Sequence, residues 1–213
     1  AEFAHEFIRN KAKFAYNPII ASGEGACVLH YEKNDEVCQD GHLLLLDVGA
    51  SFAYYNADMS RTIPVNGHFT DRQKKVYQSV LNVLKLTRKE LVPGKKIKDI
   101  QSFAEDTIKE ELIKLGLISS EQLKNKDETR QVVKKYFPHG VSHLLGLDVH
   151  DVGDSSEILK PGMLFTCEPG IYIKEESLGV RLENNILLTE SGNIDLMSSI
   201  PIEIDEIEQI MNR

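Results

Sequence analysis

Acidic residues that interrupt apolar segments constrain the fold of this chain more than any other feature. Asp47 directly follows the apolar run Leu43–Leu46, and Asp58 lies eleven residues later, in a segment rich in aliphatic and aromatic residues. The midpoint between the two acids falls at Phe52-Ala53. If the two segments form a β-hairpin around that point, both acidic side chains lie opposite each other on one face of the sheet.

A second pair of acids follows the same pattern. Glu168 ends one apolar segment and Glu183 follows another, with their midpoint in the polar pair Glu175-Glu176. Two carboxylates side by side on a half-buried surface repel each other and resist losing water unless a positive charge holds them. One such pair could equally well be solvated, or bound to Lys or Arg. Two pairs, one in each of two hairpins, favour bound divalent metal ions.

Three histidines within twelve residues support the metal hypothesis: His139, His143 and His150. A proline and two glycines accompany them, so the segment is predicted to form turns and a strand rather than the helix of an H-E-x-x-H zinc site. A structural histidine held by a hydrogen bond explains any one of them, but explains three beside four paired acids poorly. Four carboxylates and one imidazole suit two ions, with Mn²⁺ favoured and Zn²⁺ or Co²⁺ as alternatives. Two such ions can hold a shared water and polarise a carbonyl, as in metal-dependent hydrolysis.

The composition bears on partners and location. The 25 basic and 33 acidic residues give a formal net charge of −8, which repels phosphate backbones, so no nucleic-acid partner is expected. No apolar run approaches the roughly 20 residues that cross a bilayer, and no signal peptide is recognised. A cytoplasmic protein without membrane contact is therefore expected. Cys27, Cys38 and Cys167 have no C-x-x-C spacing, so they are interpreted as buried thiols in a reducing compartment, and no structural zinc is expected. Strand alternation predicts that Cys167 points away from the metals into the core.

Periodicity and turn residues predict the order helix, strands, two helices, strands. The predicted helices are an opening helix around residues 3–8, a long helix from Thr70 to about Leu91, and a helix near 97–115 that ends at Gly116. Thr70 with Gln73 resembles a capping box. Residues 119–130 are expected to form an exposed polar connection. The predicted strands are Cys27–Tyr31, Leu43–Ala50, Ala53–Val65, Ser142–His150, Met163–Lys174 and Leu178–Leu188.

The segments around these acids and histidines resemble the catalytic domain of aminopeptidase P (Xaa-Pro aminopeptidase), a metallopeptidase with the pita-bread fold. The resemblance covers about residues 22–189, and its histidine segment is the most specific part. The matching segments are Leu-Asp47-Val-Gly, Asp58-Met-Ser-Arg-Thr, His139-Gly-Val-Ser-His143, Asp-Val-His150-Asp, Glu168-Pro-Gly-Ile-Tyr and Arg181-Leu-Glu183.

This resemblance implies an α/β fold of the α+β type. A curved, mainly antiparallel sheet would carry the metals on its concave face, and helices would pack on its outer face. Residues 1–213 are then expected to form a single catalytic domain. The chain has no initiator Met and opens in a helical pattern, so we expect a piece of a longer protein, without the family's N-terminal domain and first catalytic-domain helix.

By the same resemblance, the two metal ions would be bound by Asp47, Asp58, His143, Glu168 and Glu183. Asp58 and Glu183 would bridge both ions. Asp47 would bind one ion, and His143 and Glu168 would bind the other. Glu168 would also accept a proton from the attacking water.

Four further residues are implied to serve catalysis. His30, His139 and His150 match histidines that lie near the substrate, and the last two would hydrogen-bond the scissile amide and the developing oxyanion. Arg181 matches an arginine of the network around the site. Two structural alternatives stay open here: His30 could cap a strand end, and Arg181 could simply neutralise nearby acids.

The implied reaction is hydrolysis of the bond between an N-terminal residue and a penultimate proline, by attack of a water or hydroxide held between the ions. The expected partners are peptides with proline in the second position, and a homodimer is implied for the full-length protein. One alternative is an Xaa-Pro dipeptidase (prolidase), which uses the same ligands. The other is a non-catalytic pita-bread module that binds peptides, which would be expected to lose ligands, whereas all five are present here.

Overall fold

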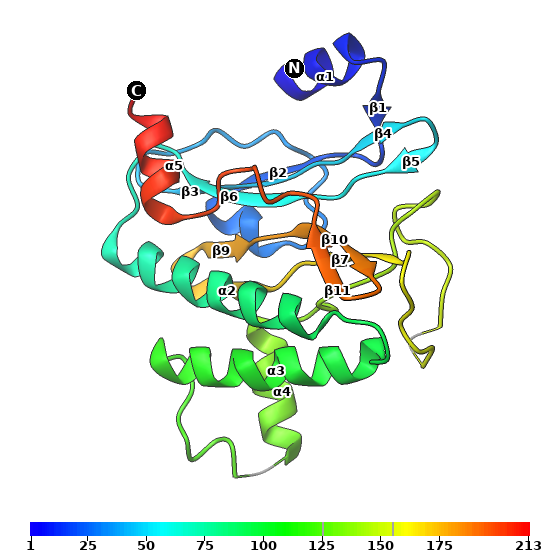
Figure 1. The fold of residues 1–213 in the computed structure, drawn as a ribbon. Helices are drawn as coiled ribbons and strands as arrows, with labels where there is room; N and C mark the ends of the chain where they lie inside the picture. The colour runs from blue at the N-terminus through cyan, green and yellow to red at the C-terminus, as the bar shows by residue number, and fades with distance from the viewer. Residues whose placement is uncertain (125, 155) are drawn as a thin grey trace.

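The chain folds into antiparallel strands covered on one side by helices (Figure 1). This computed structural model describes residues 1–124, 126–154 and 156–213. Its α-helices are α1 (Glu2–Arg9), α2 (Asp71–Glu90), α3 (Ile97–Lys114), α4 (Lys126–Tyr136) and α5 (Ile204–Met211). Its strands are β1 (Lys13–Phe14), β2 (Ile19–Ser22), β3 (Leu43–Asp47), β4 (Ala50–Phe52), β5 (Tyr55–Asn56), β6 (Ser60–Pro64), β7 (Leu164–Cys167), β8 (Gly170–Ile173), β9 (Leu178–Arg181), β10 (Asn184–Thr189) and β11 (Gly192–Asp195). Two 3-10 helices are η1 (Gly23–Cys27) and η2 (Lys174–Glu176).

Strand pairing confirms the expected antiparallel arrangement. The strand orders are β1-β4-β5, β2-β3-β6, β11-β10-β7 and β8-β9, and every strand pair among the described residues is antiparallel. Helices α2, α3 and α4 lie together on one side of the strands, while α1 lies at the opposite end of the molecule (Figure 1). The predicted α/β class with helices on one outer face is therefore confirmed.

The first predicted hairpin forms, but its register differs by two residues from the prediction. Asp47 at the end of β3 pairs with Ser60 at the start of β6, and Asp58 lies just before that strand. The turn centres on Ala53 and Tyr54, one residue later than predicted, and both residues have left-handed φ angles of 49° and 71°. Because the shift is an even number of residues, the two acids still belong to the same face of the hairpin.

The second predicted hairpin forms in the predicted register. Cys167 pairs with Asn184 between β7 and β10, and β8 pairs with β9 in the continuation of the same register. Glu168 and Glu183 therefore lie opposite each other, as predicted. Pro169 follows Glu168 and has no backbone N–H to donate, so the ladder breaks here. The strand predicted over 163–174 is consequently divided into β7 and β8 at Glu168, and the strand predicted over 178–188 is divided into β9 and β10 at Glu183.

The strand predicted over Cys27–Tyr31 does not form. Gly23–Cys27 form η1 instead, and the backbone N–H of Val28 donates to the carbonyl of Gly25 (3.0 Å) to close its end. Ala26 is buried in a small apolar cluster with side chains of β2, β3 and β8. The compact turn therefore buries Ala26 and Cys27 without strand pairing, while Val28 is exposed.

The strand predicted over Ser142–His150 is also wrong, although its first half runs beside β7. The backbone N–H of Thr166 donates to the carbonyl of His143 (3.0 Å), as in a ladder. Backbone bonds flank it on both sides, from the N–H of Glu168 to the Val141 carbonyl (2.9 Å) and from the N–H of Leu145 to the Leu164 carbonyl (3.0 Å). Side chains replace only the return bond of this pair: the N–H of His143 donates to Thr166 Oγ1 (3.1 Å), and Ser142 Oγ donates to the Thr166 carbonyl (2.5 Å). Beyond this point Asp151 Oδ2 accepts from the N–H of residue 147 (3.1 Å), which folds the chain into a turn.

The helix predictions are confirmed. Both hydrogen bonds of the capping box between Thr70 and Gln73 are present at the start of α2. Gly116 follows α3 with a left-handed φ of 71°, as expected of a residue that ends a helix. The expected polar connection over 119–130 contains the start of α4, and residue 125 lies outside the described residues. Helix α5 was not predicted.

The main core lies between the helices and the strands. Cys167 belongs to it, as predicted, with its Sγ 3.9 Å from the carbonyl oxygen of Leu84 in α2. Cys27 is also buried, but the prediction of a buried thiol is wrong for Cys38, which is exposed in the loop before β3. Among the described residues, no helix is both long enough and apolar enough to cross a membrane. Fully buried members of this core include Val76, Tyr77, Val80, Ile100, Ile108, Val180 and Ile186.

Gly49 allows the two arms of the first hairpin to approach each other between β3 and β4. A Cβ atom at this position would lie 1.8 Å from the carbonyl oxygen of Ala57 and 2.7 Å from Cε1 of Tyr16. Neither the backbone of Ala57 nor the packed ring can easily move, so any side chain here forces the hairpin apart. The position of Asp58, the next residue after Ala57, therefore depends on this glycine.

We predict that Gly49→Ala lowers the free energy of unfolding by at least about 2 kcal/mol, because the added methyl overlaps the backbone of Ala57. Urea unfolding followed by far-UV circular dichroism measures the change. Gly140→Ala is the matched control, since its Cβ would meet nothing closer than 3.9 Å. Equal unfolding midpoints for Gly49→Ala and the unaltered protein would contradict the interpretation.

Candidate functional site

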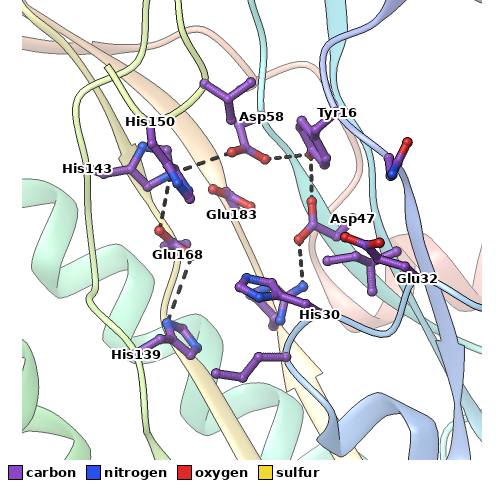
Figure 2. Close-up of a pocket in the computed structure, with 15 residues that line it drawn as sticks. Tyr16, His30, Glu32, Asp47, Asp58, His139, His143, His150, Glu168 and Glu183 are labelled. Atoms are coloured by element: carbon purple, nitrogen blue, oxygen red, sulfur yellow. Dashed lines mark hydrogen bonds and ion pairs between the residues drawn. The ribbon is translucent and has the colours of Figure 1, made fainter. Parts of the chain in front are cut away.

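A cavity of about 320 Å³ lies where the two hairpins meet (Figure 2). The hairpins are joined there by a backbone hydrogen bond from Glu183 to Ser60 (3.0 Å). All nine residues predicted from the sequence line this one cavity: His30, Asp47, Asp58, His139, His143, His150, Glu168, Arg181 and Glu183. The structure thus brings together the complete predicted set, while the role of each residue stays a prediction.

Tyr16 joins the two acids of the first hairpin. Its hydroxyl oxygen lies 2.6 Å from Asp47 Oδ1 and 2.6 Å from Asp58 Oδ1 (Figure 2). Burial and these two carboxylates raise the pKa of Tyr16, so the phenol keeps its proton. A phenol has one proton to donate, so Tyr16 can donate to only one of the two carboxyl groups at a time. Burial also raises the pKa of Asp47, although Arg181 opposes this.

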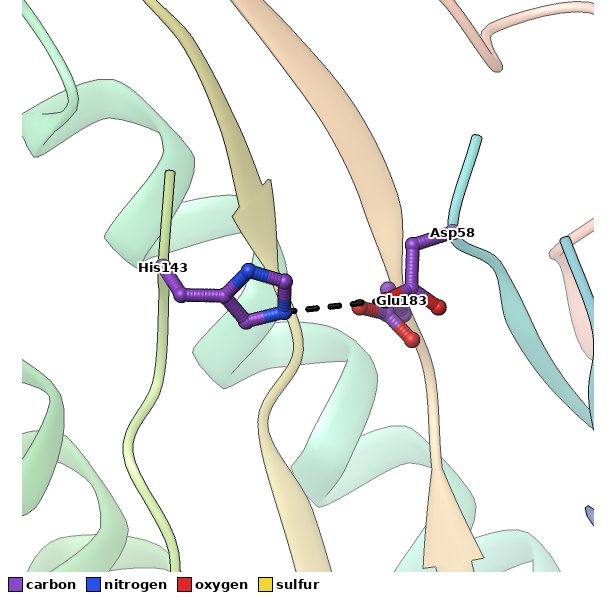
Figure 3. A group of neighbouring side chains, drawn as sticks. All are labelled: Asp58, His143 and Glu183. Atoms are coloured by element: carbon purple, nitrogen blue, oxygen red, sulfur yellow. Dashed lines mark ion pairs between the residues drawn. The ribbon is translucent and has the colours of Figure 1, made fainter. Parts of the chain in front are cut away.

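Glu183 has an unsatisfied oxygen in the centre of the cavity. Ser60 Oγ donates to Glu183 Oε2 (2.8 Å), but Oε1 is buried and has no hydrogen-bond partner among the described residues. Burial, with a contribution from Asp58, raises the pKa of Glu183 well above its usual range. A buried carboxylate oxygen without a partner destabilises the fold, so this oxygen calls for a positive ligand. Asp58, His143 and Glu183 each offer one potential ligand atom within 4.8 Å of the others (Figure 3).

His143 presents one ring nitrogen to the acids. Its Nδ1 is 2.9 Å from the backbone oxygen of Leu144, which can only accept, so Nδ1 carries the hydrogen. Its Nε2 lies 3.6 Å from Asp58 Oδ2 and 3.4 Å from Glu168 Oε1. Burial lowers the pKa of His143, but the hydrogen bond to Asp58 and the charge of Glu168 outweigh it and raise the pKa overall. A backbone carbonyl on one nitrogen and acids at the other is the arrangement typical of a metal-binding histidine.

Glu168 completes the group of acids. Thr166 Oγ1 donates to Glu168 Oε1 (3.3 Å), and Glu168 Oε2 lies 3.9 Å from Nδ1 of His139. Burial raises the pKa of Glu168 to about 7, against opposing contributions from His143 and Arg181. This carboxyl group therefore exchanges its proton near neutral pH.

Arg181 connects the acids to a tyrosine and a histidine. Its guanidinium donates to Asp47 Oδ2 (2.6 Å), to Ser60 Oγ (3.0 Å) and to the hydroxyl of Tyr172 (2.8 Å). The residue is only 4% exposed, so its charge acts where water screens little. Arg181 does neutralise Asp47. It also donates to the Tyr172 hydroxyl, which contacts His139, so Arg181 connects to a second residue of the site besides Asp47.

His139 uses both ring nitrogens within the protein. Its Nδ1 is 2.8 Å from the Gly140 carbonyl, an acceptor, so we assign the hydrogen to Nδ1. Nε2, 2.8 Å from the hydroxyl of Tyr172, then accepts from it, and that hydroxyl accepts in turn from Arg181. Burial lowers the pKa of His139 to about 4, so the ring is neutral at pH 7. A substrate bond to His139 would have to replace one of these two contacts.

His150 and His30 have ring nitrogens available for a ligand. Within the described parts of the chain, neither has a hydrogen bond to its ring. The ring of His150 lies edge-on to His143, with centroids 4.4 Å apart, and burial together with His143 lowers the pKa of His150. His30 follows η1 rather than a strand, so it does not cap a strand end.

The donor set fits divalent cations. Four carboxylates converge with one imidazole nitrogen, and one carboxylate oxygen lacks a partner among the described residues. Burial, with a smaller contribution from neighbouring acids, raises the pKa values of Asp47, Glu168 and Glu183. Two divalent cations would compensate these four negative charges, and oxygen-rich ligation suits hard or borderline ions. The residues that could hold them are Asp47, Asp58, His143, Glu168 and Glu183.

The sequence reasoning missed several residues of the site. Tyr172 and Thr166 lie an even number of residues from Glu168, so strand alternation could have placed them on its side. Ser60 lies two residues after Asp58 and could have been found in the same way. Tyr16 has no comparable local signal, because its place beside the acids depends on the pairing of β1 with β4 and of β2 with β3.

Comparisons with known proteins agree with this geometry. The sequence profile of metallopeptidase family M24 matches residues 1–190. The Xaa-Pro aminopeptidase of Haemophilus influenzae is 42% identical over 231 aligned positions, which cover 100% of this chain and 52% of the relative. Escherichia coli aminopeptidase P with the inhibitor Pro-Leu superimposes with a TM-score of 0.92 at 38% identity, covering 99% of this chain and 51% of that one. A zinc-substituted form in complex with product also gives 0.92 at 38% identity, with 99% and 50% covered. The chain spans about half the length of the curated relatives it matches.

We predict that divalent metal binding weakens as the pH falls below about 7, because Glu168, with a pKa of about 7, then binds a proton that competes with the metal. The metal-free protein should show the opposite pH dependence in its stability. Because folding raises the pKa of this carboxyl group, its ionisation lowers the free energy of unfolding as the pH rises towards 7. Isothermal titration with Mn²⁺ at about pH 5.5 and about pH 7.5, in buffers of different ionisation enthalpy, measures affinity and proton release. The same affinity at both pH values, with no proton released, would contradict this account.

Proposed function

Because the chain belongs to metallopeptidase family M24, we propose that it acts as an Xaa-Pro aminopeptidase. It has the α/β pita-bread fold of the aminopeptidase P structures it resembles. The proposed reaction is hydrolysis of the amide bond between an N-terminal residue and a penultimate proline, in peptides that carry proline in the second position. We also propose that residues 1–213 form a single catalytic domain.

One observation carries the proposal. Five side chains of ligand type, from segments far apart in the sequence, converge in one cavity, and the buried Glu183 Oε1 has no hydrogen-bond partner among the described residues. A module that only bound peptides would not need to maintain four crowded carboxylates at a cost in stability. The intact set therefore supports catalysis over a binding role.

The chain's own residues divide the catalytic work. Two divalent cations bound by the five ligands would polarise the scissile carbonyl and activate a water molecule. In this proposal Glu168 would accept the proton of that water and return it to the leaving proline nitrogen. His150, whose pKa is lowered by burial and whose ring has no hydrogen bond among the described residues, would donate to the substrate carbonyl. Arg181 and Tyr172 hold Asp47 and His139 in position.

The chemistry of the ligands supports a proposal for the metal. Four carboxylates against one imidazole favour Mn²⁺ in our proposal, with Zn²⁺ and Co²⁺ as alternatives. A relative solved with zinc indicates that such a site accepts more than one ion. A homodimer and a cytoplasmic location stay predictions from the sequence.

Removal of a ligand should abolish activity. Glu183→Ala and His143→Ala are each expected to lower kcat/KM for an Xaa-Pro-Xaa tripeptide at least about a hundredfold in the full-length protein, since losing even a residue that supports a ligand costs ten- to a hundredfold. His68→Ala, an exposed histidine outside the cavity, is the matched control and should retain full activity. Undiminished turnover in the two ligand variants would refute the assignment.

Substrate length separates the proposed activity from that of a prolidase. We expect Xaa-Pro-Xaa tripeptides to be cleaved with a higher kcat/KM than Xaa-Pro dipeptides by the metal-loaded full-length protein. Product release followed by chromatography gives both values. Cleavage confined to dipeptides would assign the protein as a prolidase instead.

A further inference from the structure

One charged side chain in the cavity takes no part in the arrangement described so far. Glu32 lines the same cavity as the five ligand residues, yet it is exposed to solvent (Figure 2). In the described parts of the chain, its carboxylate has no hydrogen bond and no ion pair. The inner acids differ from it, because Asp47 is held by Arg181 and Tyr16, and Glu183 is held by Ser60.

The backbone at Glu32 is fixed although its side chain is exposed. Asn34 Nδ2 donates to the carbonyl of Glu32 (3.1 Å) and to the carbonyl of Pro18 (2.8 Å). Its Oδ1 accepts from the N–H of Ile20 in β2 (2.6 Å). Asn34 has a left-handed φ of 52°, which asparagine tolerates better than most residues. This side chain therefore clamps the loop to the start of β2 and sets the place of Glu32 beside the cavity.

No positive group among the described residues contacts the carboxylate of Glu32. Arg181 is committed to Asp47, and the two divalent cations would be held by the five inner ligand residues rather than by Glu32. The neighbouring Lys33 does not line the cavity. With the proposed metals bound, Glu32 is thus a carboxylate of the cavity whose direct contacts remain free for a ligand, as far as the described residues go.

We propose that Glu32 determines specificity for the first residue of the substrate, favouring an N-terminal residue with a cationic side chain, Arg or Lys, over a neutral or acidic one. This inference rests on the proposed function. The scissile bond must lie at the ligand residues, so the side chain of the first residue extends along the cavity wall. Ile19 and Leu29 line that cavity and offer apolar surface for the methylene stem of Arg or Lys, whose charged end then reaches Glu32.

The test compares kcat/KM for tripeptides X-Pro-Gly, with X as Arg, norleucine or Glu, using the metal-loaded full-length protein. We expect Arg to be preferred over norleucine by about two- to fivefold, the size of a partly exposed ion pair, and the preference to shrink in high salt. Glu32→Gln should remove the preference, and Glu32→Lys should shift it towards Glu. Glu36→Gln is the matched control, because it removes the same charge from the same loop outside the cavity.

The outcomes separate this inference from the proposed function. If Glu32→Gln leaves the ratio of kcat/KM between the Arg and norleucine peptides unchanged, the specificity role of Glu32 is overturned. Cleavage of the peptides still supports the proposed function in that case. An equal loss for all three peptides also overturns it, since Glu32 would then act on a group common to every substrate, such as the α-amino group. If no peptide is cleaved, the proposed function fails. The Kd values of the same peptides for the unaltered protein and for Glu32→Gln then test the role of Glu32 without cleavage. Loss of the preference for the Arg peptide in Glu32→Gln supports the role, and an unchanged preference overturns it.

Discussion

Repulsion among carboxylates gathered in one cavity is the constraint on which the rest of this structure depends. Asp47, Asp58 and Glu183 are buried and Glu168 is partly buried, and burial raises the pKa values of Asp47, Glu168 and Glu183. Burying such charges without partners costs several kcal/mol for each ion, about as much as a domain's whole margin of stability. The fold therefore has to supply positive partners, and Arg181 supplies only one of them.

The two hairpins answer this constraint in different ways. In the first, Tyr16 bonds both acids and Gly49 lets the two arms approach each other. In the second, Pro169 breaks the ladder beside Glu168, so that this acid and its opposite partner are freed from regular pairing and turn into the cavity. Hydrogen bonds across the hairpins from Ser60, which bonds both Glu183 and Arg181, tie the two halves together.

The sequence predicted the elements and the site residues better than it predicted exact pairing. Alternation and turn residues located both hairpins and both long helices, because these signals are local in the chain. The predicted register of the first hairpin was wrong by two residues. Its turn lies at Ala53 and Tyr54, which have left-handed φ angles although neither residue type favours them. The segment around His143 was predicted as a strand, but its pairing with β7 is short: side chains of Ser142 and Thr166 replace one ladder bond, and Asp151 then folds the chain into a turn. Tyr16 reaches the acids only through long-range pairing, which no local pattern reveals.

The central claim is that the acids converge because divalent cations neutralise them. Crystals of the protein grown with Mn²⁺ and measured on both sides of the manganese absorption edge test this claim most directly, since anomalous scattering locates the ions without reference to activity. We predict two anomalous peaks within coordination distance of Asp47, Asp58, His143, Glu168 and Glu183. A cavity with no peak, or peaks bound elsewhere on the surface, would contradict the account.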